Sequence, residues 1–95
     1  MALEVARSEH DVVVKVVGTF DAAAAERLRD LLEGALDGGG AARVTLDFSR
    51  AREVTYVALA AVASYRPRAA VALRLTGLSL RHSRMLSYLG DGLAD

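Results

Sequence analysis

Few side chains in this sequence have the types and the spacing that catalysis or metal binding requires. His10 and His82 are the two histidines, and neither has a second histidine or a carboxylate four residues further on. Cysteine is absent, so neither a thiolate metal site nor a disulfide can form. Isolated histidines are usually structural or solvated. We therefore predict no catalytic, metal-binding or cofactor-binding residue.

Asp47 and Ser49 invite a catalytic interpretation, because a carboxylate and a hydroxyl stand two residues apart near the end of an apolar segment. A Ser-His-Asp arrangement would also need a strained nucleophile turn and a placed histidine, and the sequence indicates neither. The simpler prediction is that the Asp47 carboxylate accepts hydrogen bonds from loop amides, or favours the positive end of the next helix. We expect a protein that is not an enzyme.

The segment that begins at Thr55 is the strongest candidate for a working surface. Thr55 either caps a helix or exposes its hydroxyl at the helix N-terminus, where an added phosphate would meet a favourable dipole. Tyr56 and Val57 follow in the first turn, where they form either an apolar contact patch or part of the core. A strand that leads into this helix places the turn at the carboxyl edge of a sheet, where functional sites gather.

The elements that precede this segment follow from periodicity. The pattern of residues 2–17 predicts a β-hairpin. Near-continuous β-branched residues over 12–17 predict a central strand that is covered on both faces. The segment 18–21 breaks this strand. Asp21 is expected to cap a helix over 22–36, where the apolar residues form one stripe.

The second half of the chain continues the alternation of strands and helices. Alternating apolar residues over 44–48 predict a buried strand, and a charged connection over 49–54 leads to the helix that begins near Thr55. A strand over 71–76 and a third helix over 80–89 follow. The order β-β-α-β-α-β-α predicts an α/β domain with a four-stranded, mostly parallel sheet, an N-terminal hairpin and helices packed on it.

Length, composition and charge exclude several classes of protein. Ninety-five residues make one domain, assigned to 1–90, with a loose tail over 91–95. No apolar run approaches the roughly 20 residues that span a bilayer, and signal-peptide features are absent, so we expect a cytoplasmic protein without membrane insertion.

A formal net charge of zero argues against nucleic-acid binding. From Arg50 onward, however, seven arginines accompany three acids, either as a basic face or as ordinary solvated surface.

Three parts of the sequence together are similar to one known family. They are the turn Gly18-Thr19-Phe20-Asp21, the strand end Val44-Thr45-Leu46-Asp47-Phe48-Ser49, and the pair Leu75-Thr76-Gly77 and Tyr88-Leu89-Gly90 around the last helix. In this order and spacing they resemble the STAS domain, the fold of bacterial anti-sigma factor antagonists, over about residues 10–90. The resemblance implies a STAS-like fold and a regulatory, protein-binding function.

The phosphorylation motif of that family is degenerate in this chain. Members that are switched by phosphorylation carry Asp-Ser-Ser/Thr-Gly-Leu at the start of the second helix. The matching positions here are Thr55, Tyr56, Val57, Ala58 and Leu59. A Ser/Thr kinase finds no serine, and the threonine occupies the acidic position. The resemblance therefore implies no serine-phosphorylation switch.

Two hypotheses of function follow. The first is a non-enzymatic module that docks onto a protein partner, an ATPase-fold anti-sigma factor kinase or a related regulator. The residues expected to bind this partner are Thr19, Asp21, Ser49, Glu53, Val54, Thr55, Tyr56, Val57 and Ala58. The second is an accessory or scaffolding subunit of a larger assembly, either associated with a transporter or homo-oligomeric, for example a homodimer.

Overall fold

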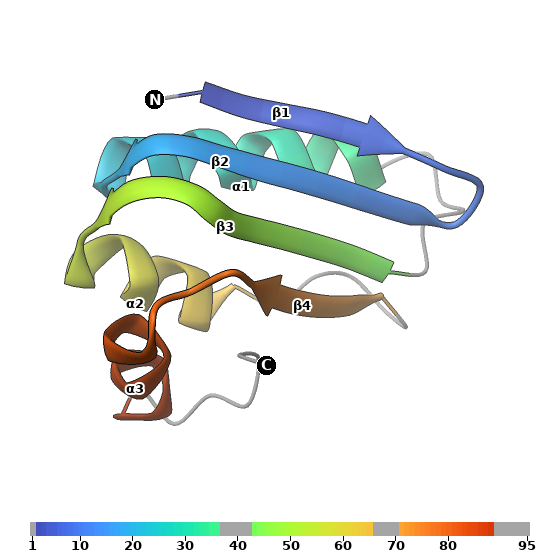
Figure 1. Cartoon of the computed structure of the whole chain (residues 1–95). Helices are drawn as coiled ribbons and strands as arrows, with labels where there is room; N and C mark the ends of the chain where they lie inside the picture. The colour runs from blue at the N-terminus through green and yellow to red at the C-terminus, as the bar shows by residue number, and fades with distance from the viewer. Residues whose placement is uncertain (1, 37–42, 66–70, 89–95) are drawn as a thin grey trace.

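The computed structural model of the chain is described over residues 2–36, 43–65 and 71–88 (Figure 1). The bounds of the elements are Ala2–Arg7 (β1), Asp11–Phe20 (β2), Ala22–Leu36 (α1), Arg43–Val54 (β3), Tyr56–Ser64 (α2), Ala72–Thr76 (β4) and Leu80–Tyr88 (α3). This order confirms the predicted α/β fold. The predicted tail over 91–95 and the domain boundary at residue 90 lie outside the described residues.

The sheet has four strands in the order β1-β2-β3-β4. β1 pairs with β2 antiparallel, as the predicted hairpin requires, and the other two pairs are parallel. The hairpin turns at residues 8–10, where the Ser8 N–H donates to the Asp11 carbonyl oxygen over 2.9 Å. The mostly parallel sheet is thereby confirmed.

The core lies on one face of this sheet, under α1 and α2, and α3 packs against α2. In β2, Val12, Val14 and Val16 are buried, whereas Val13 is half-buried and Lys15 is exposed. The prediction that this strand is covered on both faces is therefore wrong. β-branched residues on the outer face fit a pleated surface without a second helical layer above them. The core side chains are Val12, Val14, Val16, Phe20, Ala24, Ala25, Leu28, Leu32, Val44, Leu46, Phe48, Val54, Ala58, Leu59, Val62, Ala63 and Leu75.

Both central strands extend further than the sequence predicts. β2 runs through the predicted break at Gly18, whose φ is +90°, to Phe20, and β3 runs through the predicted connection over 49–54. The ladder shifts its register near Lys15 and again after Gly18. A glycine with positive φ produces a bulge within a strand as readily as a turn at its end. The extension carries the start of α2 beyond β4, which pairs only with residues 43–47 of β3.

Candidate protein-binding surface

The junction between β3 and α2 is held by backbone pairing with the end of β2. Thr19 pairs with Glu53, Phe20 pairs with Val54, and the Thr55 N–H donates to the Phe20 carbonyl oxygen over 3.0 Å. The side chains of Phe20 and Val54 are buried, whereas those of Thr19 and Glu53 are exposed. The structure thus brings two separate sequence segments together at one exposed edge.

Both helices at this edge begin with a side-chain cap. Oγ1 of Thr55 accepts from the Ala58 N–H over 3.2 Å. The carbonyl oxygen of Thr55 accepts from the Leu59 N–H over 3.1 Å. Asp21 caps α1 in the same way, because its Oδ1 accepts from the Ala24 N–H over 2.9 Å. Thr55 therefore takes the first of its two predicted roles, the helix cap, and the capping by Asp21 is also as predicted.

The first turn of α2 presents apolar side chains to solvent. Tyr56 is 53% exposed and Val57 is 60% exposed, so of the two predicted arrangements they take the one at the surface and do not join the core. Val54 and Ala58 differ from the expectation, since they are 8% and 0% exposed. Both point into the core beneath the junction, so the side chain of Ala58 is not available to a partner, and that of Val54 offers only the small part of its surface that lines a cleft beside the junction.

Ser49 lies apart from this turn, contrary to its place among the expected contacts. It precedes Glu53 by four residues on β3, roughly 13 Å along an extended strand. Its N–H donates to Oδ1 of Asp47 over 2.9 Å, so Asp47 accepts from a backbone amide as predicted, but that amide lies within β3 and not in a loop. This bond and one from the Ser49 hydroxyl lower the pKa of the Asp47 carboxyl, with smaller contributions from Lys15 and Arg50. Asp47 is thus a local structural residue.

A cleft of about 410 Å³ lies beside the junction, and α3 forms its other wall. The lining residues are Arg52, Glu53, Val54, Thr55, Tyr56, Arg81, His82 and Met85. Ser79 fixes the start of α3, because its Oγ accepts from the His82 N–H over 3.2 Å. No sequence pattern predicted that α3 lies at this site. The one feature of the sequence that pointed to a basic surface is the excess of arginine after position 50.

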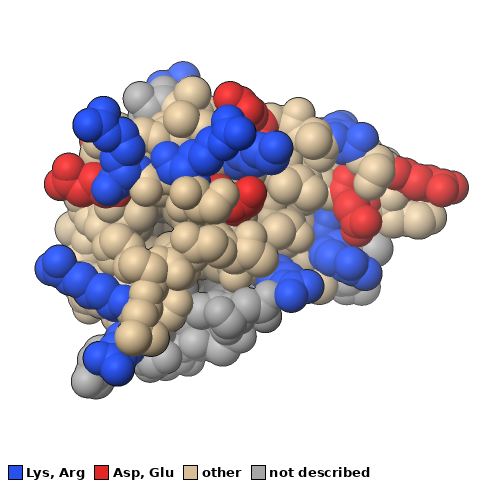
Figure 2. Space-filling model, in the orientation of Figure 1, with Lys and Arg blue, Asp and Glu red and all other residues tan. Residues whose placement is uncertain are grey.

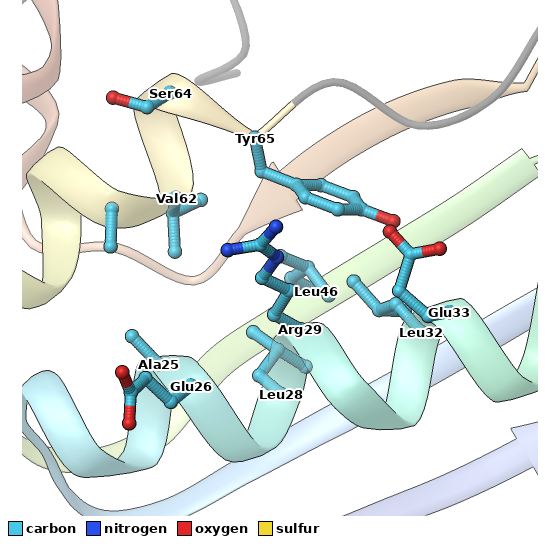
Figure 3. Close-up of a pocket in the computed structure, with 11 residues that line it drawn as sticks. Ala25, Glu26, Leu28, Arg29, Leu32, Glu33, Leu46, Val62, Ser64 and Tyr65 are labelled. Atoms are coloured by element: carbon cyan, nitrogen blue, oxygen red, sulfur yellow. The ribbon is translucent and has the colours of Figure 1, made fainter.

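A second hollow of about 430 Å³ lies between α1 and the later part of α2. Figure 3 shows Leu28, Leu32 and Leu46 beneath it, with Arg29 and Tyr65 reaching over it. Two carboxylates, of Glu26 and Glu33, also line this hollow. It contains neither Tyr56 nor Val57, so it is separate from the surface at the start of α2.

The described residues offer neither a metal site nor a membrane-spanning helix. They contain no group of three or more His, Cys, Asp or Glu side chains that could hold a metal ion. None of the helices in these ranges combines the length and the apolar character that crossing a membrane requires.

Three solved structures share the fold of this chain. The anti-sigma factor antagonist SpoIIAA in its unphosphorylated form matches with a TM-score of 0.74 and 18% identity, over 92% of this chain and 83% of that chain. A serine-to-glutamate variant of RsbS from Moorella thermoacetica matches with a TM-score of 0.73 and 16% identity, over 99% of this chain and 85% of that chain. The phosphorylated form of SpoIIAA from Bacillus matches with a TM-score of 0.54 and 18% identity, over 95% of this chain and 67% of that chain.

Identities this low show the fold alone, and no curated protein matches the chain significantly. The family comes from the sequence profile described as "Mlab, STAS domain", which matches residues 3–92. That range contains every described helix and strand except the first residue of β1. The chain therefore belongs to the STAS domain family.

Proposed function

We propose that this chain is a non-enzymatic regulatory module that binds a protein partner through the β3–α2 junction and the first turn of α2. Membership of the STAS family and the fold shared with the anti-sigma factor antagonist SpoIIAA support a regulatory binding module. The observation that carries the proposal is the exposure of Tyr56 and Val57 on a turn that Thr55 holds in place. An exposed aromatic side chain on a rigid backbone suits a protein interface, because little side-chain entropy is lost on binding.

The proposed partner is an anti-sigma factor kinase or a related regulator, and the proposed compartment is the cytoplasm. Tyrosine and valine occupy the two positions where phosphorylated family members carry hydroxyl acceptors. Thr55 stands at the acidic position of that motif, and its hydroxyl oxygen caps α2. Binding is therefore independent of serine phosphorylation.

The test measures binding by calorimetry to each anti-sigma factor kinase and related regulator of the source organism. Wild type is compared with Tyr56→Asp and Val57→Asp, and with Val5→Asp as the matched control. Val5 is an exposed valine on β1 (43% exposed). We expect each α2 variant to bind about tenfold more weakly or worse, as for residues near the centre of an interface, and the control to bind normally. Unchanged binding by both α2 variants would show that the surface is assigned wrongly.

A homo-oligomeric scaffold is the second candidate, and the exposed Val5 favours it. β1 is an edge strand of the described sheet, and an unpaired edge with an apolar side chain can add a strand from a second copy. Light scattering at several protein concentrations tests this candidate. A dimer that persists on dilution and that Val5→Asp dissociates would support it, whereas a monomer at all concentrations would rule it out.

A further inference from the structure

We infer that the docking surface at the start of α2 continues onto α3, and that it accepts an acidic segment of the partner with an apolar side chain at its centre. This inference rests on the proposed function, because it names the chemistry of the partner at the same surface. It adds two features of the structure that no sequence pattern connects. These are the cleft between the junction and α3, and the arginines on both of its walls.

The cleft joins segments that are far apart in the sequence. Arg52 and Tyr56 come from the β3–α2 junction, and Arg81 and Met85 come from α3, which lies beside α2 in Figure 1. Val54, almost fully buried, and Met85, partly buried against the core, give this cleft apolar lining. An apolar side chain of a partner can therefore enter between two arginines.

The arginines of this surface have no acidic partner in the described part of the chain. Arg52 and Arg81 are exposed, and no carboxylate of residues 2–36, 43–65 or 71–88 lies within 4.0 Å of their guanidinium nitrogens. Glu53 is the one acidic residue among those that line the cleft. Figure 2 shows basic side chains above and below uncharged surface at the left end of the molecule, with an acidic side chain beside the upper ones. The charge of this surface is thus complementary to carboxylates.

Like the first turn of α2, the start of α3 exposes a large apolar side chain to solvent. Leu80, the first residue of α3, is 69% exposed, the highest value among the large apolar side chains of the described residues. Leu80 precedes Arg81 in the chain, so α3 carries an exposed apolar side chain at the position before one of the arginines that line the cleft. Tyrosine and arginine are enriched where protein interfaces are buried, and opposite charges at the rim speed association.

A protein segment fits this surface better than a nucleic acid does. The formal net charge of the chain is zero, so the chain offers a nucleic acid little of the electrostatic attraction on which its binding depends. The apolar lining gives a phosphate backbone nothing to contact. Carboxylates spaced by apolar side chains, in contrast, can use both features of the cleft.

The test titrates the ¹⁵N-labelled chain with an amphipathic peptide of glutamate and leucine and follows its amide chemical shifts. Versions of the peptide with glutamine or lysine in place of glutamate, and a short DNA duplex, are the comparison probes. We expect the acidic peptide alone to shift the amides of Arg52, Tyr56 and Arg81, with binding that weakens as salt is raised. Equal shifts with the lysine peptide, tighter binding of the duplex, or no shift at these amides with any probe would overturn the inference.

Variants of single arginines sharpen the test. Arg81→Gln and Arg52→Gln should each weaken binding of the acidic peptide about twofold to fivefold, and Arg81→Glu should weaken it further. Arg27→Glu, at an exposed position on α1 that does not line the cleft, is the matched control and should leave binding unchanged. Equal effects of the cleft variants and the control would also contradict the inference.

This inference and the proposed function fail in different ways. Suppose that Tyr56→Asp abolishes binding to a regulator while Arg52→Glu and Arg81→Glu leave it unchanged. The proposed docking surface at the start of α2 would then be supported, and the inference that the partner segment is acidic would be contradicted. If the acidic peptide binds the cleft but no regulator binds the chain, the inference that the cleft accepts an acidic segment would be supported, and the proposed class of partner would be wrong.

Discussion

Gly77 is the residue at which backbone conformation and packing most strictly limit the side chain. Its φ is +76°, in the left-handed region that favours glycine, and a Cβ placed there would lie 2.5 Å from the Ser49 backbone nitrogen. The turn after β4 therefore lies directly against β3, next to the bond that Ser49 makes to Asp47. A side chain at position 77 would have to push these two segments apart.

Gly77→Ala should lower the free energy of unfolding by about 2–4 kcal/mol, because left-handed strain and overpacking act together. The control is Gly34→Ala, within α1, where a Cβ meets no atom within 4 Å. That change should raise the free energy of unfolding by about 0.5–1 kcal/mol, since alanine favours the helix. Urea denaturation of both variants measures the two effects. If they moved stability in the same direction, the close approach at Ser49 would be refuted.

Asp47 should make stability depend on pH in the acid range. Its pKa is lowered in the folded protein, so its contribution is complete above the unfolded pKa of about 4 and is lost as pH falls through the folded pKa. Asp47→Asn keeps an acceptor for the Ser49 N–H but removes the charge. We expect the variant to be about 0.5 kcal/mol less stable at neutral pH, a small value because the hydrogen bond to Ser49 is exposed to solvent.

Urea denaturation at several pH values between neutrality and about pH 3 measures this dependence on Asp47. The difference in stability between wild type and Asp47→Asn should narrow as the pH falls below about 4. A difference that stays constant over this range would show that the charge of Asp47 contributes nothing.

At the scale of the elements, α2 depends on its cap and its packing more than on its own sequence. It has nine residues, fewer than an isolated helix needs in water, and it contains two valines, which are mediocre helix formers. Its buried side, formed by Ala58, Leu59, Val62 and Ala63, packs in the core. The Thr55 cap therefore determines how firmly the exposed turn is held.

Thr55→Ala should reduce the free energy of unfolding by about 1 kcal/mol, because the Ala58 N–H loses its acceptor. Thr55→Ser retains a hydroxyl oxygen and should recover most of this stability. Thermal denaturation followed by circular dichroism compares the two variants with wild type. If serine were as destabilising as alanine, the threonine methyl group and not the cap would explain the loss.

Elements that depend on local sequence could be predicted, and those that depend on distant pairing could not. Asp21 and Thr55 are recognisable as caps because a cap and the amide it binds are three residues apart. The charged residues of 49–54 give no strand signal of their own, because they become a strand by pairing with the end of β2. The cleft against α3 depends in the same way on contacts between distant elements, so residues such as Arg81 were missed.

For the molecule as a whole, Phe48 joins the sheet to the layer of helices. Its ring meets that of Phe20 edge to face, with centroids 5.2 Å apart and planes at 78°. The two rings come from the neighbouring strands β2 and β3, on the face that α1 and α2 cover. The outer face has no helical layer in the described structure, so most of the buried apolar surface belongs to this single core.

Phe48→Ala should therefore affect the whole domain. A buried phenylalanine replaced by alanine costs about 3–5 kcal/mol, a large part of the roughly 5–14 kcal/mol expected for a domain of this length. The midpoint of thermal unfolding should fall on the order of 20 °C, in one cooperative transition. Val5→Ala, at an exposed position on β1, is the control and should change the midpoint by no more than a few degrees. If Phe48→Ala instead produced two transitions, with the hairpin of β1 and β2 unfolding separately from the helices, the sheet and the helices would not share one core.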